Sequence, residues 1–312
     1  MTPFALKPPR WVYLIFLAGV GALTVRALLD SRFANSSLLY VATPFLVSFL
    51  LFQFTPKPNK TSATLRYLSH IRDATIVMLA TSAFLFEGFL CVLFFMPIFY
   101  LIISINFLAD VFTNRRGRHD RSKLRASVLP IFIAVLAIEG VAPSTSFERQ
   151  NEVTRTVIID LSIDELKANM AMPIELPKKR HWFLSVFPLP VDVQAGSLER
   201  GDVHKLKFIY KRWFFTNIQE GRFDLRIDAV EATEVRTSVV SNTSYLSKYL
   251  KIKNTRIVFD PLPDGRTQVS LTIQYDRLLD PAWYFGPLQR FAVEQSGDYF
   301  ISSVFVRGAH HE

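Results

Sequence analysis

The amino-acid sequence predicts an α+β protein in two parts. An N-terminal α-helical membrane bundle is followed by a domain in which a curved antiparallel sheet wraps around a long C-terminal helix. Three observations lead to this prediction. Long apolar runs are concentrated in residues 1–143. From residue 150 onward, apolar and polar residues alternate in short runs, which is typical of strands. From residue 280 onward, apolar residues recur at helical spacing.

The positive charge is confined to one half of the chain. The formal net charge is +9, with 15 Lys/Arg against 7 Asp/Glu in residues 1–150 and 21 against 20 in residues 151–312. The excess therefore lies in the loops between apolar runs, where it indicates the orientation of membrane helices. A nucleic-acid binder would carry a basic face on its soluble part. We expect no nucleic-acid partner and a lipid bilayer as the main partner.

Residues 74–112 are mostly apolar, and their only charged residues are Glu87 and Asp110. A helical span needs about 20 apolar residues, so this stretch has the length of two. Basic residues flank it on both sides, and basic loops stay on the cytoplasmic side of a membrane. The stretch is therefore predicted to be a helical hairpin that turns near Glu87-Gly88 or shortly before Pro97. The alternative is a single kinked helix.

Five spans are expected in the transmembrane region, residues 1–143. They cover residues 11–29, 38–54, 74–92, 95–113 and 127–142. The basic loops 1–10, 55–73 and 114–125 then share one side. This predicts a multi-pass protein of the cytoplasmic (inner) membrane, with a cytoplasmic N-terminus and an extracytoplasmic C-terminal domain. A count of four spans would reverse the side of that domain.

Two acids, Glu87 and Glu139, lie in or near the predicted spans. Ionisable groups inside a membrane are costly, which makes both of them functional candidates. Five spans also bring each acid near the outer end of its helix, where a carboxylate costs little. Both interpretations remain open from the sequence.

The second half begins with a predicted strand at 153–159 and short helices at 162–172. Several strand-like runs follow. Asp264-Gly265 is a hairpin signal, and it precedes the clearest alternation in the chain, Val269 to Tyr275. Asp280 is a predicted N-cap, with Pro281 at the first position of the last helix. Gly286-Pro287 is expected to bend or restart that helix.

Short motifs in this half resemble a known superfamily. They are Phe187-Pro188-x-Pro190, Asp264-Gly265-x-Thr267 and the stretch 280–287 at the start of the last helix. With the order of elements, residues 150–306 resemble the START-like superfamily, also called SRPBCC, helix-grip or polyketide cyclase/dehydrase-like. Residues 307–312 are left as a tail. The apolar runs before the domain, with Glu87-Gly88-x-x-Cys91, are similar to those of bacterial membrane proteins that carry such a domain.

The resemblance implies a cavity between sheet and helix that holds a lipid or another apolar ligand. Apolar side chains of the predicted strands and helix are expected to line it, although a filled core needs the same residues. They are Phe208, Tyr210, Phe223, Leu225, Val269, Leu271, Ile273, Tyr275, Leu288, Phe291 and Tyr299.

The sequence contains no recognisable catalytic or metal-binding motif. It has one cysteine, Cys91, and its six histidines show no ligand spacing apart from the terminal pair His310-His311. G-x-S-x-G and P-loop motifs are missing. We therefore expect no metal, no cofactor and no catalytic residue.

Three functions are compatible with these observations. The first is a membrane protein that presents a START-like domain for an apolar ligand at the membrane surface. The second is a cyclase-like enzyme, for which Tyr210, Asp224, Tyr275 and Glu294 are the available titratable groups. The third is a structural or interaction subunit of a membrane complex. The basic and aromatic segment 178–182 is either a membrane-touching segment or an ordinary loop.

Overall fold

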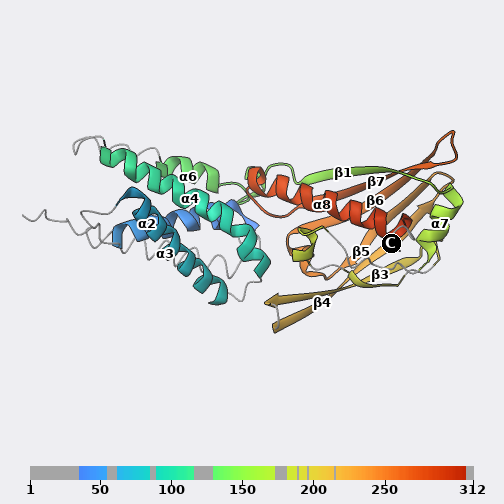
Figure 1. Cartoon of the computed structure of the whole chain (residues 1–312), viewed down its shortest axis with the longest axis horizontal. Coiled ribbons are helices and arrows are strands. Elements are labelled where there is room, and N and C mark those ends of the chain that lie inside the picture. The colour runs from blue at the N-terminus through green and yellow to red at the C-terminus, as the bar shows by residue number, and fades with distance from the viewer. Residues whose placement is uncertain are drawn as a thin grey trace, which may run out of the picture.

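The structure is a computed structural model that describes residues 35–54, 62–84, 89–115, 129–172, 181–187, 190–194, 197–213 and 216–306. Figure 1 shows an elongated molecule with a group of helices at one end and a curved sheet, crossed by the last helix, at the other. The helix α8 and the strand β1 both begin at the end of the sheet that faces the helices.

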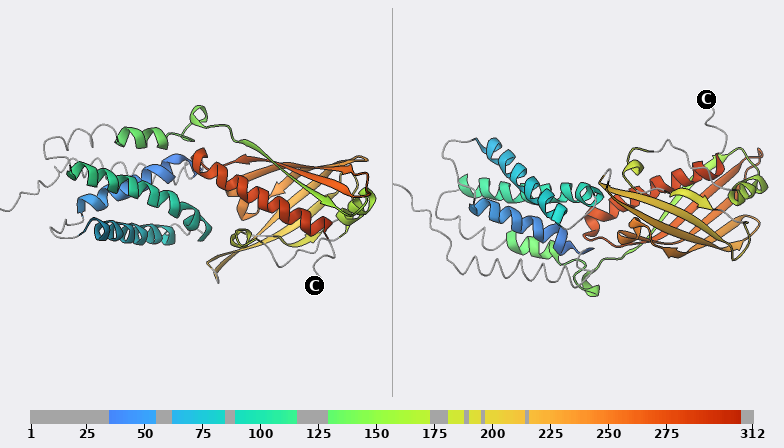
Figure 2. Two further views of the ribbon diagram at one scale, coloured as in Figure 1. Left: turned by 45° about the horizontal axis from the view of Figure 1, so that its top comes forward. Right: turned by 90° about the horizontal axis from the view of Figure 1, so that it is seen from below.

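The N-terminal part consists of four helical segments in the described residues. A π-helical turn η2 leads directly into α2, and α3 and α4 are separated by four residues. The bounds are η2 Leu38–Ala42, α2 Thr43–Phe54, α3 Ala63–Phe84, α4 Phe89–Arg115 and α6 Leu129–Ala137. Figure 2 shows these helices lying side by side in both views.

Helices α3 and α4 pack against each other as an antiparallel pair. The hydroxyl groups of Tyr67 and Ser104 are 2.7 Å apart, and those of Thr75 and Tyr100 are 2.8 Å apart. The pairing runs in opposite directions along the two helices, so the chain reverses between them. The expected turn at Glu87-Gly88 lies outside the described residues.

The helix bounds differ from the expected spans. Residues 11–29 lie outside the described part, α3 begins before residue 74, and α6 is shorter than residues 127–142. Helix α3 starts early because Leu65 and Leu68 continue its helical spacing toward the N-terminus. Among the residues that the structure describes, no helix combines the length and the apolarity needed to cross a membrane.

Seven antiparallel strands form one sheet in the order β1-β7-β6-β5-β4-β3-β2. The first strand pairs with the last, with Val153 opposite Ile273, so β1 and β2 are the two edges. The bounds are β1 Gln150–Ile159, β2 Pro190–Gln194, β3 Val203–Trp213, β4 Thr216–Val230, β5 Glu234–Asn242, β6 Leu250–Pro261 and β7 Thr267–Arg277.

Strand β7 has the alternation that its sequence predicts. Val269, Leu271, Ile273 and Tyr275 are buried, and the residues between them are partly or fully exposed. The hairpin before it turns at Gly265, whose φ of +84° is a left-handed conformation that suits glycine. Sheets with one covered face show this period of two.

The C-terminal helix α8, Ala282–Phe305, lies across the covered face of the sheet (Figure 2). Arg155 on β1 makes two hydrogen bonds of 2.7 Å to the Asp298 carboxylate on α8. A Cβ at Gly297 would lie 3.1 Å from the Cγ of Arg155, so the helix approaches β1 closely at this glycine. The predicted curved antiparallel sheet around a long C-terminal helix is confirmed.

Three shorter helical segments connect the strands, and a fourth, η3, precedes β1. They are η3 Pro143–Thr145, α7 Ile163–Ala171, η4 Leu184–Val186 and η5 Tyr245–Lys248. The Ser162 hydroxyl and the Glu165 carboxylate form a capping box at the start of α7. The predicted helix after the first strand is therefore present.

One prediction about α8 is wrong, and of the two alternatives predicted at Gly286-Pro287, a bend or a restart, the restart does not occur. Asp280 is not the N-cap, because Pro281 occupies that position and the Asp280 carboxylate instead accepts a 2.5 Å hydrogen bond from Arg277. The helix also does not restart at Pro287, which lies inside one continuous helix.

Candidate ligand-binding cavity

An apolar cavity of about 190 Å³ lies between the covered face of the sheet and α8. One water molecule needs roughly 15 Å³ by the same measure, so the space is large enough for a ligand. The strands supply one wall and α8 the other, and η4 and η5 contribute at the sides. The lining residues are Leu184, Phe187, Pro190, Val193, Leu206, Phe208, Phe223, Leu225, Asn242, Ser244, Leu246, Leu250, Ile252, Thr255, Leu271, Ile273, Ala292, Val293, Ser296, Tyr299, Phe300 and Ser303.

The structure brings six of the predicted lining residues together at this cavity. They come from two pairs of elements, β3 with β4 and β7 with α8, which are separated from each other by β5 and β6. They are Phe208, Phe223, Leu225, Leu271, Ile273 and Tyr299. That these side chains bind a ligand stays a prediction.

The other predicted residues lie elsewhere. Tyr210 stacks on Tyr245 with ring centroids 4.3 Å apart. Val269 and Tyr275 are part of the buried core, and burial raises the pKa of Tyr275. Leu288 lines a neighbouring cavity, and Phe291 packs against an aromatic cluster at the side of α8.

The polar side chains of the cavity are hydrogen-bonded within the protein. The Ser244 hydroxyl donates to Asn242 at 2.7 Å, and the Ser303 hydroxyl donates to the Tyr299 carbonyl at 2.6 Å. The hydroxyl groups of Thr255 and Thr237 are 2.7 Å apart. Because these hydroxyl groups already bond to protein atoms, they offer a ligand hydrogen-bond acceptors more than free donors.

Among the described residues that line the cavity, Tyr299 is the single titratable side chain. The groups considered for catalysis are not brought to it. Glu294 pairs with Arg290 at 3.1 Å on α8, and Asp224 is not among the lining residues. The arrangement can enclose an apolar molecule, but it gives no pair of acid and base on one substrate.

Two smaller cavities continue the space at both ends of α8. One of about 40 Å³ shares Leu225 and Phe300 with the main cavity. The other, of about 60 Å³, shares Phe187 and Ala292 with it. The latter reaches the N-terminal helices, because Phe94 of α4 lines it. The three cavities therefore form a row along the helix.

Aromatic side chains line the side of α8 next to the N-terminal helices. Phe94 on α4 stacks with Phe187 at 5.3 Å between centroids and contacts Phe183 edge-on at 6.0 Å. Phe183 in turn contacts Phe291. Trp182 beside them is 72% exposed. The sequence had indicated this segment as either membrane-touching or an ordinary loop.

Charged residues are buried where the two parts of the molecule meet. Arg277 at the end of β7 is 2% exposed, and Asp280 is fully buried. Arg277 contacts Asp280 at 2.5 Å and Glu139 at 3.3 Å. Arg149 contacts the other oxygen of Asp280 at 2.5 Å. Two arginines and two carboxylates therefore balance each other, as buried charges require.

Glu139 also holds the start of α8. Its two carboxylate oxygens accept hydrogen bonds of 2.9 and 3.0 Å from the backbone N–H of Ala282. A carboxylate at a helix N-terminus is favourable because the dipole there is positive. Gly140, with a φ of +79°, follows it, and a Cβ at this position would overlap the Asp280 carboxylate. Glu139 is thus a structural link between α6 and α8, and Glu87 lies outside the described residues.

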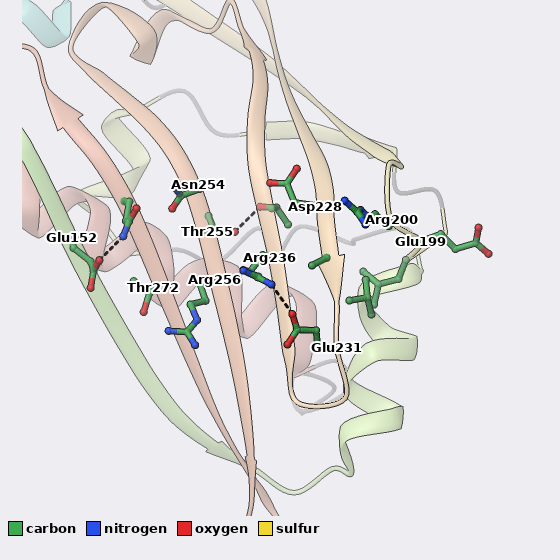
Figure 3. Close-up of a pocket in the computed structure, with 15 residues that line it drawn as sticks. Glu152, Glu199, Arg200, Asp228, Glu231, Arg236, Asn254, Thr255, Arg256 and Thr272 are labelled. Atoms are coloured by element: carbon green, nitrogen blue, oxygen red, sulfur yellow. Dashed lines mark hydrogen bonds and ion pairs between the residues drawn. The ribbon is translucent and has the colours of Figure 1, made fainter.

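A wide groove of about 940 Å³ lies on the opposite face of the sheet. Figure 3 shows the charged side chains that line it, including Glu152, Glu231 and Arg236. Arg236 contacts Glu231 at 2.6 Å, and Arg256 contacts Glu234 at 2.6 Å. That hydrogen bond from Arg256 lowers the pKa of Glu234. Because these charges pair with each other, we interpret the groove as a solvated sheet face.

Sequence reasoning missed the residues that close the cavity from its sides. Leu184, Phe187, Leu246 and Leu250 come from η4, η5 and the strand that follows η5, where no periodicity identifies an inward face. Arg277 could have been found, because it continues the alternation of Ile273 and Tyr275 into the buried face.

No family model matches the sequence, and no curated protein matches it. Solved structures are similar over about half of the chain. A START superfamily protein from Mycobacterium smegmatis is 13% identical, covering 50% of this chain and 95% of its own, with a TM-score of 0.34. The Zhui aromatase/cyclase from Streptomyces sp. R1128 is 16% identical, covering 52% and 98%, with a TM-score of 0.34.

Norcoclaurine synthase from Thalictrum flavum is 8% identical, covering 53% of this chain and 97% of its own, with a TM-score of 0.36. At these values the similarity carries no inference about activity. Residues 150–306 form a curved seven-stranded antiparallel sheet with a long C-terminal helix across its covered face, which is the architecture predicted from the sequence.

Proposed function

We propose that this chain is a multi-span protein of the cytoplasmic membrane whose START-like domain binds a lipid or another apolar ligand without catalysis. Residues 1–143 form the membrane region, residues 150–306 the binding domain and residues 307–312 a tail. The observation that carries this proposal is the apolar cavity between the sheet and α8.

The composition of the cavity supports binding over catalysis. Its walls are aliphatic and aromatic, and the few polar groups bond to neighbouring residues. Ligand pockets have this character, with a volume of roughly 300–1,000 Å³ for drug-sized molecules. The main cavity with its two extensions approaches the lower end of that range. A slender hydrocarbon chain suits such a space better than a bulky fused-ring molecule.

The position of the cavity supports a role at a membrane surface. Phe94 of α4 contacts Phe183 and Phe187 beside the cavity, and Trp182 next to them is exposed. Tryptophan, like tyrosine, is enriched at the interface between lipid and water. The basic loops of residues 1–143 favour a cytoplasmic N-terminus and an extracytoplasmic domain.

Lipid binding is tested on the full chain held in amphipol, by native mass spectrometry followed by extraction and identification of the bound molecule. Two variants add the same side chain on the two sides of the sheet, one from α8 on the covered side and one from β4 on the outer side. Ala292→Phe fills the cavity, whereas Ala229→Phe changes the outer groove. We expect an added mass of lipid size in the wild type and in Ala229→Phe, and its loss in Ala292→Phe.

A wild-type chain that carries no added mass, even after incubation with a membrane lipid extract, would contradict the proposal. An added mass that Ala292→Phe retains would place the lipid on the surface of the helices. Either result would favour the interaction subunit of a membrane complex. Thermal unfolding of both variants shows whether the added phenyl ring is accommodated.

A further inference from the structure

A small cavity at the joint of the two parts is lined in part by Gln289, whose amide oxygen receives no hydrogen bond from the residues that the structure describes. The cavity is lined by Tyr40 of η2, Phe95 of α4 and Gln289 of α8. Gln289 is 6% exposed, and its Nε2 donates a 3.0 Å hydrogen bond to the Tyr249 carbonyl. Its Oε1 is buried and accepts no hydrogen bond from the described residues.

The orientation of this amide follows from its surroundings. Rotating the group would place Oε1 against the Tyr249 carbonyl oxygen, and two acceptors cannot bond each other. Oε1 therefore remains the free end. A buried acceptor without a donor is costly and rare in native proteins. The other lining residues are mainly aliphatic and aromatic, so an added donor fits this position better than an added anion.

We propose that Gln289 is a polar subsite that accepts a hydrogen bond from the neutral hydroxyl end of a single-chain amphiphile. The proposal rests on the proposed function, because the hydrocarbon chain of the same molecule occupies the main cavity. The two spaces adjoin at Phe187, Leu246, Leu250 and Ala292. The hydroxyl end then faces the N-terminal helices, and the chain points toward Ser303.

The dimensions agree with one chain. Between Gln289 and Ser303, α8 extends about 21 Å, at about 1.5 Å per residue. A lipid chain spans one leaflet, which is about 15 Å or half of the hydrocarbon core. A chain of about 15 Å with its hydroxyl end therefore fits within the distance of about 21 Å between these two residues. An ionised carboxylate or phosphate offers only acceptors and would meet Oε1 in an apolar space, which excludes it.

The test compares two ligands that differ in one donor, hexadecan-1-ol and its methyl ether. Binding of each radiolabelled ligand to the full chain in amphipol is measured by equilibrium dialysis. We expect the wild type to bind the alcohol about tenfold more tightly than the ether, since only the alcohol satisfies Oε1. Gln289→Met should bind the two ligands within about twofold of each other.

Gln295→Met is the matched control, because Gln295 lies on the same helix but is absent from the lining of both cavities. It should keep the tenfold preference. A wild type without preference for the alcohol overturns the subsite, and so does a Gln289→Met variant that retains the preference. The wild-type comparison alone decides the matter if Gln289→Met does not fold.

The two proposals fail differently. Equal binding of alcohol and ether leaves the proposed function intact and removes the subsite. Binding of neither ligand overturns the proposed function and the subsite with it. A third ligand, 1-monopalmitoylglycerol, separates the sources of the hydroxyl group. If its binding depends on Gln289, the site takes a glycerolipid; if only hexadecan-1-ol shows that dependence, it takes a free fatty alcohol.

Discussion

The helical part and the sheet domain both bury apolar side chains, but they differ in what they expose. In the sheet domain, the apolar residues of β7 face inward, with Val269 fully buried and Leu271 1% exposed. The opposite face carries paired charges such as Arg256 and Glu234. In the helical part, large apolar side chains point outward, with Ile76 59% exposed and Leu101 45% exposed.

The interior of the helical part contains polar residues. Ser48, His70 and Asn106 are buried there, and hydroxyl pairs join α3 to α4 at Tyr67–Ser104 and Thr75–Tyr100. A helix in water turns its apolar face to the core. Helices in lipid have no such bias, and polar groups and small residues hold them together. The outward apolar side chains of α3 and α4 are the feature by which the proposed membrane region can be tested.

At the joint between the two parts, charged residues are both buried and paired with one another. Replacing Arg277 by Met leaves Glu139 and Asp280 without their shared partner. We expect a loss of about 3–5 kcal/mol in the free energy of unfolding, which is typical for breaking a buried pair. Thermal and denaturant unfolding of the full chain measure this loss.

Arg256→Met is the control on the outer face of the sheet, where the partner Glu234 keeps access to water. It should change stability little, since exposed ion pairs contribute little. Similar losses of unfolding free energy in both variants would mean that the ion pairs at the joint stabilise the protein no more than those on the outer face of the sheet.

Leu101→Arg tests the outward apolar face of α4, because Leu101 is exposed and lies near the middle of that helix. In a lipid nanodisc we expect a loss of about 2.5–3.5 kcal/mol, the insertion cost of arginine at the centre of a span. Folding yield and the midpoint of thermal unfolding report it.

Ile158→Arg provides the matched change on β1, where Ile158 is 49% exposed. Surface substitutions in water usually stay within about 0.5 kcal/mol. If Leu101→Arg is as harmless as Ile158→Arg, the helices face water and the membrane region is wrong.

The smallest effect concerns Tyr284, whose hydroxyl donates a 2.7 Å hydrogen bond to the Phe94 carbonyl of α4. Tyr284→Phe should lose about 1 kcal/mol at pH 7. Burial also raises the pKa of Tyr284 to about 12. A tyrosine pKa that is raised in the folded state stabilises the protein fully below the unfolded-state pKa of about 10. This stabilisation is lost as the pH rises toward 12.

Ultraviolet titration and unfolding at pH 9 to 12 check this expectation. The wild type should lose more stability than Tyr284→Phe between pH 10 and 12, and the variant should lack one late-titrating tyrosine. Parallel pH profiles for the two proteins would show that Tyr284 titrates like an exposed phenol.

Patterns local in sequence predicted the fold well. The alternation of Val269 to Tyr275 gave β7 and its buried face, and Asp264-Gly265 gave the hairpin before it. Asp280 was misassigned as a cap because the competing partner, Arg277, is held in place by Glu139 from a distant segment. A contact between residues 139 and 282 leaves no periodic signal.

The site could be predicted in part for the same reason. Residues on regular strands, such as Phe223 and Leu271, could be assigned to the cavity by their alternation. Leu246 lies in a short turn and Gln289 interrupts an apolar helix face, so neither was identifiable. Whether a core is filled or hollow depends on the summed fit of many side chains, which no single motif encodes.

The most direct test of the account locates an apolar ligand in the folded protein. The full chain in a nanodisc is given a palmitoyl lipid with a diazirine at its chain end, irradiated, digested and mapped by mass spectrometry. We predict labelled peptides from α8 around Tyr299 to Ser303 and from β4 around Leu225, in addition to lipid-facing helices, and loss of the α8 and β4 labels in Ala292→Phe. Labels confined to the outer faces of α3, α4 and α6 would contradict it.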